Sequence, residues 1–524
     1  MMDSLFLCGL LAAVSCASCS ATDSPTFSAY AVSLLLISAL AGKGAPGVAM
    51  GVGLPAALAH LQTVHLRSMA ASRELEMLPF AICLAAAAEE LPAGWTVAAT
   101  AAAIAAIGGV AAALSLWLGV SLVWAALLAA LLCLAGGRVR AALRLSQFEH
   151  CLVLYALGSC LADLTAEAEV AARHLRRSPS REVLLVVELG VVSTAAFGLA
   201  GLWLSPALQV GALGKLTGPS YCLLAAATLA YLAAMLGAMR AYLGSDPLGW
   251  VYRLCLVRDG GAAGAQALVW CVLILSAAPL ARISLEKWRW PGIVTRKVFH
   301  LLAVVMFAPP LARPALQPFV TLAFGVALCG FVLVEYARAL TAARGLVALV
   351  PGLDGVIAYL GVFTKKRDEG GRRYMIFDHL TLLLGCAVPA WRALSRGAPS
   401  SPRLPLLPFF GLVSVGVGDA VAAVAGQALG RHKWAKGSGR SLEGSAAACT
   451  SMLLSAWLLG CSLWMQGEET TREEAVAVVL TVIFITLVEA LTRENDNLVV
   501  VLYAVGFYEA TSLLLLAAGS NAGR

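Results

Sequence analysis

Apolar stretches of nearly bilayer length recur from one end of the chain to the other. Examples are Ala98–Leu114, Leu116–Ala135, Val183–Leu204, Cys222–Met239, Leu301–Leu316 and Phe319–Val334. A helix needs roughly 20 mostly apolar residues to cross the hydrocarbon core, and within the bilayer such a helix satisfies its own backbone hydrogen bonds. The pattern therefore predicts an all-α, polytopic integral membrane protein with about 14–16 transmembrane helices.

Composition excludes a water-soluble fold. Of the 524 residues, 60% are hydrophobic and 13% are charged, with a mean hydropathy of +0.84, whereas soluble domains carry about 25% charged residues. The net charge is +7, but the basic residues cluster in short loops between apolar segments, as the positive-inside rule requires. We therefore predict the lipid bilayer, and no nucleic acid, as a partner. Most of the 14 cysteines lie inside apolar segments, where Cys behaves as a small apolar residue.

The chain divides into two regions of different character. Residues 1–280 form an N-terminal series of helices joined by short loops, without recognisable chemistry. In residues 281–524, charged and hydrogen-bonding side chains gather at the ends of apolar segments. These polar clusters cover residues 288–302, 333–339, 365–373, 377–385, 414–445 and 487–500. The last is unusual, since two of the three asparagines in the chain, Asn495 and Asn497, flank Asp496.

Alternating membrane crossings place these clusters on one side. If the segment Arg431–Arg440, with its four cations, is cytosolic, the neighbouring helices return both 365–373 and 495–497 to the cytosolic face. The same scheme places an acidic loop with Glu468, Glu469, Glu473 and Glu474 on the opposite side. The scheme requires Gly345–Thr364 to be interfacial or re-entrant, which its Pro351-Gly352 pair permits. The topology thus predicts one site at the boundary between membrane and cytosol.

Gly416, Gly418 and Asp419 have two interpretations. Glycines let the backbone approach a phosphate, and a following helix N-terminus favours anions. Glycines also permit close packing of membrane helices, so the two readings stay open for Gly416 and Gly418. Asp419 favours function, because an ionisable residue at membrane depth is costly.

The segment ending at Ser445 has the composition of a triphosphate-binding loop. Flexible glycines are combined with cations and hydroxyls, and a solvated loop would explain only the charges. The predicted nucleotide-binding residues are Gly416, Gly418, Lys433, Lys436, Arg440, Ser441, Gly444 and Ser445.

Three carboxylates are the predicted catalytic groups: Asp419, Glu443 and Asp496. Asp419 and Asp496 are the predicted Mg²⁺ ligands, because carboxylates and phosphates together suit that ion. A carboxylate could equally orient or deprotonate an attacking hydroxyl, as phosphoryl transfer requires. The chain has neither a G-x-x-x-x-G-K-[ST] loop nor the protein-kinase signature set, so any nucleotide chemistry uses a membrane-embedded architecture.

The motifs of the second region, taken in order, resemble eukaryotic dolichol kinases. They are TRKVFHLL (295–302), LVEYARA (333–339), DHLTLLLG (378–385) with PAW (389–391), VGVGDAVAA (415–423), RSLEGS (440–445) and EALTRENDNL (489–498). Single motifs also occur in phytol kinases and phosphatidate cytidylyltransferases, but the whole set, from Arg282 to Tyr503, is typical of dolichol kinases. The chain departs from the family at Arg440, where a lysine is expected.

The resemblance implies transfer of the γ-phosphoryl group of CTP to the terminal hydroxyl of dolichol, which gives dolichyl phosphate and CDP. The reaction is expected at the cytosolic face of the endoplasmic reticulum membrane, with Mg²⁺ as cofactor, and its product serves N-glycosylation, mannosylation and GPI-anchor synthesis. By motif position, residues 415–445 would form the CTP-binding loop. The expected substrate or phosphate contacts are Arg296, Lys297, His300, Glu335, His379 and Asn497; the basic ones could instead anchor a helix at the headgroups, and His379 could serve packing.

Other functions remain as alternatives. A different CTP-dependent prenol kinase or a CDP-lipid cytidylyltransferase would share several motifs, although the long N-terminal region argues against the short prenol kinases. A transporter would be expected to contain an inverted repeat, and none is recognisable. Neither the preference for CTP over ATP nor the oligomeric state follows from the residues.

Overall fold

The computed structural model describes residues 160, 164, 178–204, 218–290, 292–344, 378–396, 404–434, 439–466, 471–491 and 496–522. Every regular element in these ranges is a helix, apart from one isolated bridge between Lys433 and Ser441. Seven helical segments there are long and apolar enough to cross a membrane. The chain is therefore an all-helical, polytopic membrane protein, as predicted. The predicted total of 14–16 crossings and the proposed re-entrant segment 345–364 involve residues beyond the described ranges.

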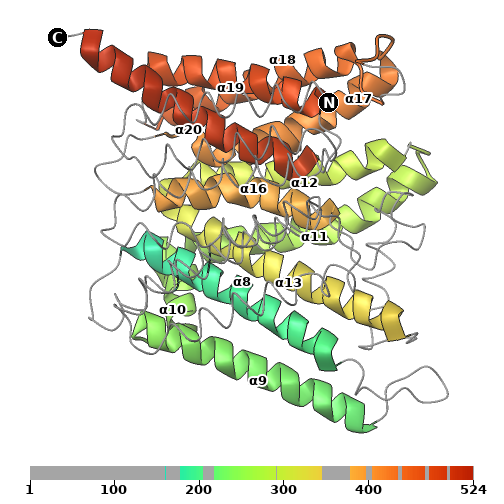
Figure 1. The fold of residues 1–524 in the computed structure, drawn as a ribbon, viewed down its shortest axis with the longest axis vertical. Coiled ribbons are helices and arrows are strands. Elements are labelled where there is room, and N and C mark those ends of the chain that lie inside the picture. Colours follow the sequence, from blue (N-terminus) through green and yellow to red (C-terminus); the bar gives the residue numbers. More distant parts are fainter. Residues whose placement is uncertain are drawn as a thin grey trace, which may run out of the picture.

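The long helices lie alongside one another in a broad stack (Figure 1), with α18–α20 at one edge and α9 at the other. Their bounds are α8 (Pro179–Leu204), α9 (Gly218–Leu243), α10 (Pro247–Tyr252), α11 (Ala262–Glu286), α12 (Gly292–Leu311), α13 (Gln317–Arg344), α16 (Asp378–Ser395), α17 (Asp419–Ala428), α18 (Leu442–Trp464), α19 (Arg472–Leu491) and α20 (Asp496–Ala522). Short segments with tighter or wider turns are 3₁₀ at Arg258–Gly261, Pro314–Leu316 and Leu407–Phe409, and π-helical at Arg253–Val257 and Leu412–Gly418.

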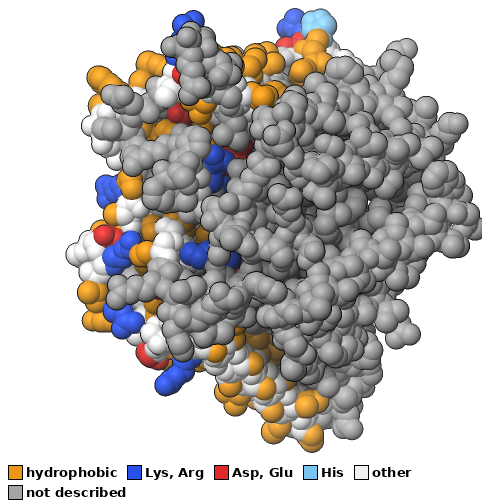
Figure 2. Space-filling view, turned by 60° about the vertical axis from the view of Figure 1, so that its left-hand side comes forward, with side chains coloured by type: hydrophobic (Ala, Val, Ile, Leu, Met, Phe, Trp, Pro, Cys, Tyr) orange, Lys and Arg blue, Asp and Glu red, His pale blue; other side chains and the backbone are white. Residues whose placement is uncertain are grey.

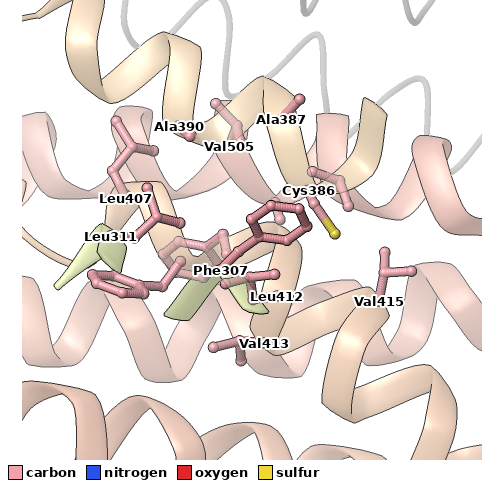
Figure 3. Close-up of a cluster of buried hydrophobic side chains, with 14 of the residues drawn as sticks. Phe307, Leu311, Cys386, Ala387, Ala390, Leu407, Leu412, Val413, Val415 and Val505 are labelled. Atoms are coloured by element: carbon pink, nitrogen blue, oxygen red, sulfur yellow. The ribbon is translucent and has the colours of Figure 1, made fainter. Parts of the chain in front are cut away.

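The main hydrophobic core lies among α12, α13, α16, α18–α20 and the segment that leads into α17. Figure 3 shows part of it, where Phe307 of α12, Cys386 of α16 and Val505 of α20 meet around Leu412. In the most apolar stretch of α20, 71% of the residues are buried, whereas in that of α9 only 6% are buried. Helix α20 is therefore a central helix. Hydrophobic side chains are exposed at the lower end of the molecule in Figure 2, where α9 lies, as expected for a surface that faces lipid.

Helix α8 joins the first region of the chain to the second. Leu185 of α8 shares a buried cluster with Leu322 of α13 and Leu394 of α16. Gly198 of α8 lies directly against the ring of Tyr336, so that any larger residue there would collide with the ring. The predicted boundary at residue 280 stays a prediction, but α8 already supports the helix that carries Glu335.

Three helical segments approach one another unusually closely near the start of α20. A Cβ atom added to Gly411 would collide with the carbonyl oxygen of Gly385, and one added to Gly385 would collide with that of Asn497. Small residues at such contacts allow membrane helices to pack backbone against backbone. The arrangement fixes α16 and α20 against the segment that leads into Asp419.

Candidate functional site

A largely buried ion pair joins α12 to α17. The Lys297 ammonium donates to the Asp419 carboxylate, and the His300 Nδ1 atom lies 3.2 Å from the same carboxylate oxygen. His300 Nδ1 also lies 2.9 Å from the carbonyl oxygen of Val415. Since a carbonyl can only accept, the geometry assigns a proton to Nδ1. The side chains of Lys297 and Asp419 are only 14% and 16% exposed, so three predicted site residues form one largely buried group.

Asp419 is positioned by a π-helical segment, Leu412–Gly418, which continues directly into α17. Gly418 has α-helical backbone angles, so Asp419 does not begin a free helix N-terminus that could bind phosphate. A Cβ atom on Gly416 would collide with Val304, and one on Gly418 would lie 2.7 Å from the Met452 sulfur. Packing thus accounts for both glycines, and their part in nucleotide binding stays a prediction.

The loop between α17 and α18 is folded back on itself. Lys433 and Ser441 form the isolated bridge, and the Lys433 ammonium donates to the carbonyl oxygen of Gly439 at 3.3 Å. The Ser441 hydroxyl caps α18 by accepting from the Gly444 amide at 3.1 Å. Ser445 accepts from the Trp434 indole at 2.9 Å. Both predicted hydroxyl residues therefore shape the loop, and we call residues 430–445 the basic loop.

Glu443 links the two ends of the basic loop through hydrogen bonds to His432. Both of its carboxylate oxygens accept from the backbone amide of His432, at 3.1 and 3.2 Å, and its Oε1 lies 2.6 Å from His432 Nδ1. The carboxylate side chain is 27% exposed and the imidazole 75%. Sequence reasoning identified Glu443 but missed His432, which has no apolar context to draw attention to it.

A second buried group joins α13 to α16. Glu335 is fully buried and accepts from Arg338 through two guanidinium nitrogens, at 2.7–3.2 Å. His379 Nε2 lies 3.5 Å from the same carboxylate, and its ring packs edge-on against Phe331 at 5.2 Å. The structure thus brings two predicted residues, Glu335 and His379, into direct contact and adds Arg338, which was not predicted, as a second partner of Glu335.

Other predicted residues are described less completely. Arg296 and Arg440 are half-buried, and Asn497 is buried at the start of α20. The Asp496 side chain and all of Lys436 lie among the residues that are not described. Their predicted roles therefore stay predictions.

A buried charged cluster was missed at the far ends of these helices. Arg392 donates to Glu509 at 2.8 and 3.0 Å, and Arg396 Nη1 lies 2.9 Å from Glu509. Tyr508 donates to Glu474, whose pKa is raised by burial. Arg392 lies about 20 Å along α16 from His379 at 1.5 Å per residue, so this far-end cluster is separate from the site.

Glu474 was expected in an acidic loop, but its side chain is buried, with 4% of the residue exposed. The rule that marks charges inside apolar helices would have identified Glu509.

The arrangement at Asp419 suits a ligand that carries several negative charges. Lys297 reaches the carboxylate from α12, and Gly444 of the basic loop packs against Ala422, one helical turn after Asp419. Lys433 and Arg440 of that loop lie beyond the far end of α17, which is about 15 Å long. Cations with fixed hydrogen-bonding geometry are the usual partners of phosphate. Among the described residues, no group of three or more His, Cys, Asp or Glu side chains is arranged to hold a metal ion.

The chain is similar to dolichol kinases of plants, animals and fungi. It is 34% identical to a dolichol kinase of Arabidopsis thaliana over 235 residues, which are 44% of this chain and 37% of the relative. It is 27% identical to the dolichol kinase of Homo sapiens over 237 residues (44% and 41%) and 30% identical to that of Schizosaccharomyces pombe over 217 residues (41% and 39%). The matched stretch thus spans well under half of each relative. No protein-family model matches the chain, and no solved structure gives a significant match.

Proposed function

We propose that the chain is a CTP-dependent dolichol kinase, which transfers the γ-phosphoryl group of CTP to the terminal hydroxyl of dolichol and yields dolichyl phosphate and CDP. The observation that carries the proposal is the buried Lys297–Asp419–His300 group, which lies one helical turn from the contact between Ala422 and Gly444 of the basic loop. The similarity to dolichol kinases supports the choice of substrates. A charged group inside a membrane protein marks a candidate functional site, and this one lies within one helical turn of the contact with the basic loop.

The residues have distinct proposed roles. Asp419 accepts the proton of the dolichol hydroxyl, or orients that hydroxyl for in-line attack, as phosphoryl transfer requires. Lys297 then exchanges its carboxylate partner for the transferring phosphate, and His300, held by Val415, keeps Asp419 in place. Lys433 and Arg440 of the basic loop bind the remaining phosphates. Positioning and electrostatic stabilisation would provide most of the rate.

Magnesium fits this site as an ion that arrives with the nucleotide. Mg²⁺ is usually bound by one or two carboxylates together with phosphates and water, and the described residues offer Asp419 for that purpose, with Asp496 at the start of α20 as the second proposed ligand. When bound, the ion would neutralise charge on the β- and γ-phosphates.

A location at the cytosolic surface of the endoplasmic reticulum is part of the proposal. Because Asp419 contacts Lys297 while Gly416 contacts Val304, α12 and α17 run antiparallel, so the cationic segment before α12 and the basic loop after α17 lie at the same end. Basic loops stay on the cytosolic side. A site at that boundary can receive water-soluble CTP from one side and a lipid alcohol from the bilayer. The product would supply sugar carriers for N-glycosylation, mannosylation and GPI-anchor synthesis.

The test uses the purified full chain in detergent, with dolichol, Mg²⁺ and radiolabelled nucleotides. Label from γ-labelled CTP, and not from γ-labelled ATP, is expected in the lipid fraction. The Asp419→Asn variant should lose the transfer, whereas Asp259→Asn should keep it, because Asp259 lies in an exposed turn before α11.

Two outcomes would contradict the proposal. Label entering the lipid from α-labelled CTP, with release of pyrophosphate, would indicate a cytidylyltransferase. Full transfer by a well-folded Asp419→Asn variant would show that the buried group is not the catalytic centre.

A further inference from the structure

The loop between α11 and α12 exposes two cations and two indole rings in alternation. Lys287, Trp288, Arg289 and Trp290 are all exposed, and the two indoles are 48% and 41% accessible. Their rings pack together with centroids 5.1 Å apart. This loop, which we call the KWRW loop, therefore presents one joined aromatic surface with a positive charge beside each ring.

The KWRW loop has a defined backbone conformation. The Trp288 amide donates to Ile283 at 3.1 Å and the Trp290 amide to Ser284 at 2.9 Å. The Ser284 hydroxyl donates in turn to Thr295 of α12 at 3.3 Å, and both hydroxyls are buried. Arg289 has φ +52°, a left-handed conformation that costs a non-glycine residue energy. The fold thus maintains a strained turn that keeps both rings on the surface.

The position of the KWRW loop indicates its partner. It immediately precedes α12, and Lys297 lies less than two helical turns after the first residue of that helix. Tryptophans gather at the level of the lipid headgroups, where lysine and arginine are attracted to anionic lipids. Neutral lipid can accommodate the indoles, but only anionic lipid adds electrostatic attraction for the alternating cations.

We propose that the KWRW loop binds the phosphate-bearing headgroups of anionic phospholipids and so fixes the site end of α12 at headgroup depth. The indoles enter the interface, and Lys287 and Arg289 contact the headgroup phosphates and carboxylates. This proposal does not depend on the identity of the phosphoryl donor or acceptor.

The test measures quenching of tryptophan fluorescence by brominated lipids in nanodiscs that contain the full chain. The contribution of the loop is the difference between the wild type and the Trp288→Phe/Trp290→Phe variant. Brominated phosphatidylserine should quench this contribution at a lower mole fraction than brominated phosphatidylcholine, by about fivefold for each cation involved. The Lys287→Gln/Arg289→Gln variant should keep the quenching but lose the preference.

A matched control removes two exposed cations from the opposite helix ends. Arg313→Gln/Arg472→Gln, after α12 and at the start of α19, should retain the preference for phosphatidylserine. The proposal is overturned if both lipids quench the wild-type loop equally or if the preference survives in the Lys287→Gln/Arg289→Gln variant. Either result would show that the loop lies in the membrane interface without binding anionic headgroups through these cations. Absence of loop-dependent quenching would place the loop outside the membrane and overturn it as well.

Discussion

Breaking the Lys297–Asp419 pair from either side should reveal whether it serves folding, catalysis or both. Both side chains are less than one-fifth exposed, so each single change leaves a buried charge without its main partner. Breaking a buried pair in this way costs about 3–5 kcal/mol. Because His300 still lies 3.2 Å from Asp419, we expect Lys297→Met to fall at the lower limit, about 3 kcal/mol. Asp419→Asn should destabilise similarly, since it strands the ammonium.

The double variant Lys297→Met/Asp419→Asn separates the two roles. With neither charge present, most of the lost stability should return, because removing both partners avoids the unpaired charge. Activity should not return. Losing a preorganised group that stabilises the transition state typically lowers kcat by a factor of about 10²–10³, and the double variant still lacks both. Thermal unfolding in detergent and transfer of label from CTP to dolichol, measured on the same preparations, test the two expectations.

Two results would refute this reasoning. A double variant that regains activity together with stability would make the pair purely structural. Single variants that keep wild-type stability would show that the two charges are not buried against each other.

Four further substitutions test three other parts of the structure. Glu443→Gln and His432→Ala should each raise the KM for CTP with little change in kcat. The double variant should raise the KM little further, because both substitutions release the same end of the basic loop. Steady-state kinetics in which Glu443→Gln alone lowered kcat would contradict this. Glu509→Gln should lower the free energy of unfolding by about 3–5 kcal/mol, because two arginines lose their buried partner, while the KM for CTP measured on folded protein stays unchanged. The Glu474 pKa is raised by burial, so its contribution to stability is complete below the unfolded-state pKa and is lost as pH rises through the folded-state pKa. The melting temperature of Glu474→Gln should therefore rise relative to that of the wild type as pH increases from below the unfolded-state pKa to above the folded-state pKa, and a constant difference would contradict the assignment.

The features that could be predicted from sequence were those with a local signal. Continuous apolar stretches identified the membrane class, and a charge inside such a stretch identified Asp419. The partner of Asp419 could not be derived in this way, because Lys297 is 122 residues away and their meeting depends on how α12 and α17 are rotated. The role of Glu443 at the base of its loop likewise depends on His432, which only the folded loop brings near.

Glu474 shows the opposite case, in which a local signal misled. It shares a short segment with Glu468, Glu469 and Glu473, and four neighbouring acids normally indicate a solvated loop. Its burial depends on Tyr508, 34 residues later in the chain, and on α20 being the central helix. The sequence pattern of one segment cannot predict its contact with Tyr508 or the central position of α20.

The π-helical turn before Asp419 makes the site depend on backbone register as well as on side chains. A π-helical turn contains one residue more than an α-helical turn, so the segment Leu412–Gly418 absorbs one extra residue within the helix. If this segment relaxed to an ordinary α-helix with all seven residues kept, everything after it would rotate by roughly 100° and shift by about 1.5 Å relative to α12. Asp419 would then turn away from Lys297 although every functional side chain was still present. Deleting one residue from the segment removes the extra residue and keeps Asp419 on the same face of the helix, so a single deletion there should be tolerated better than a single insertion.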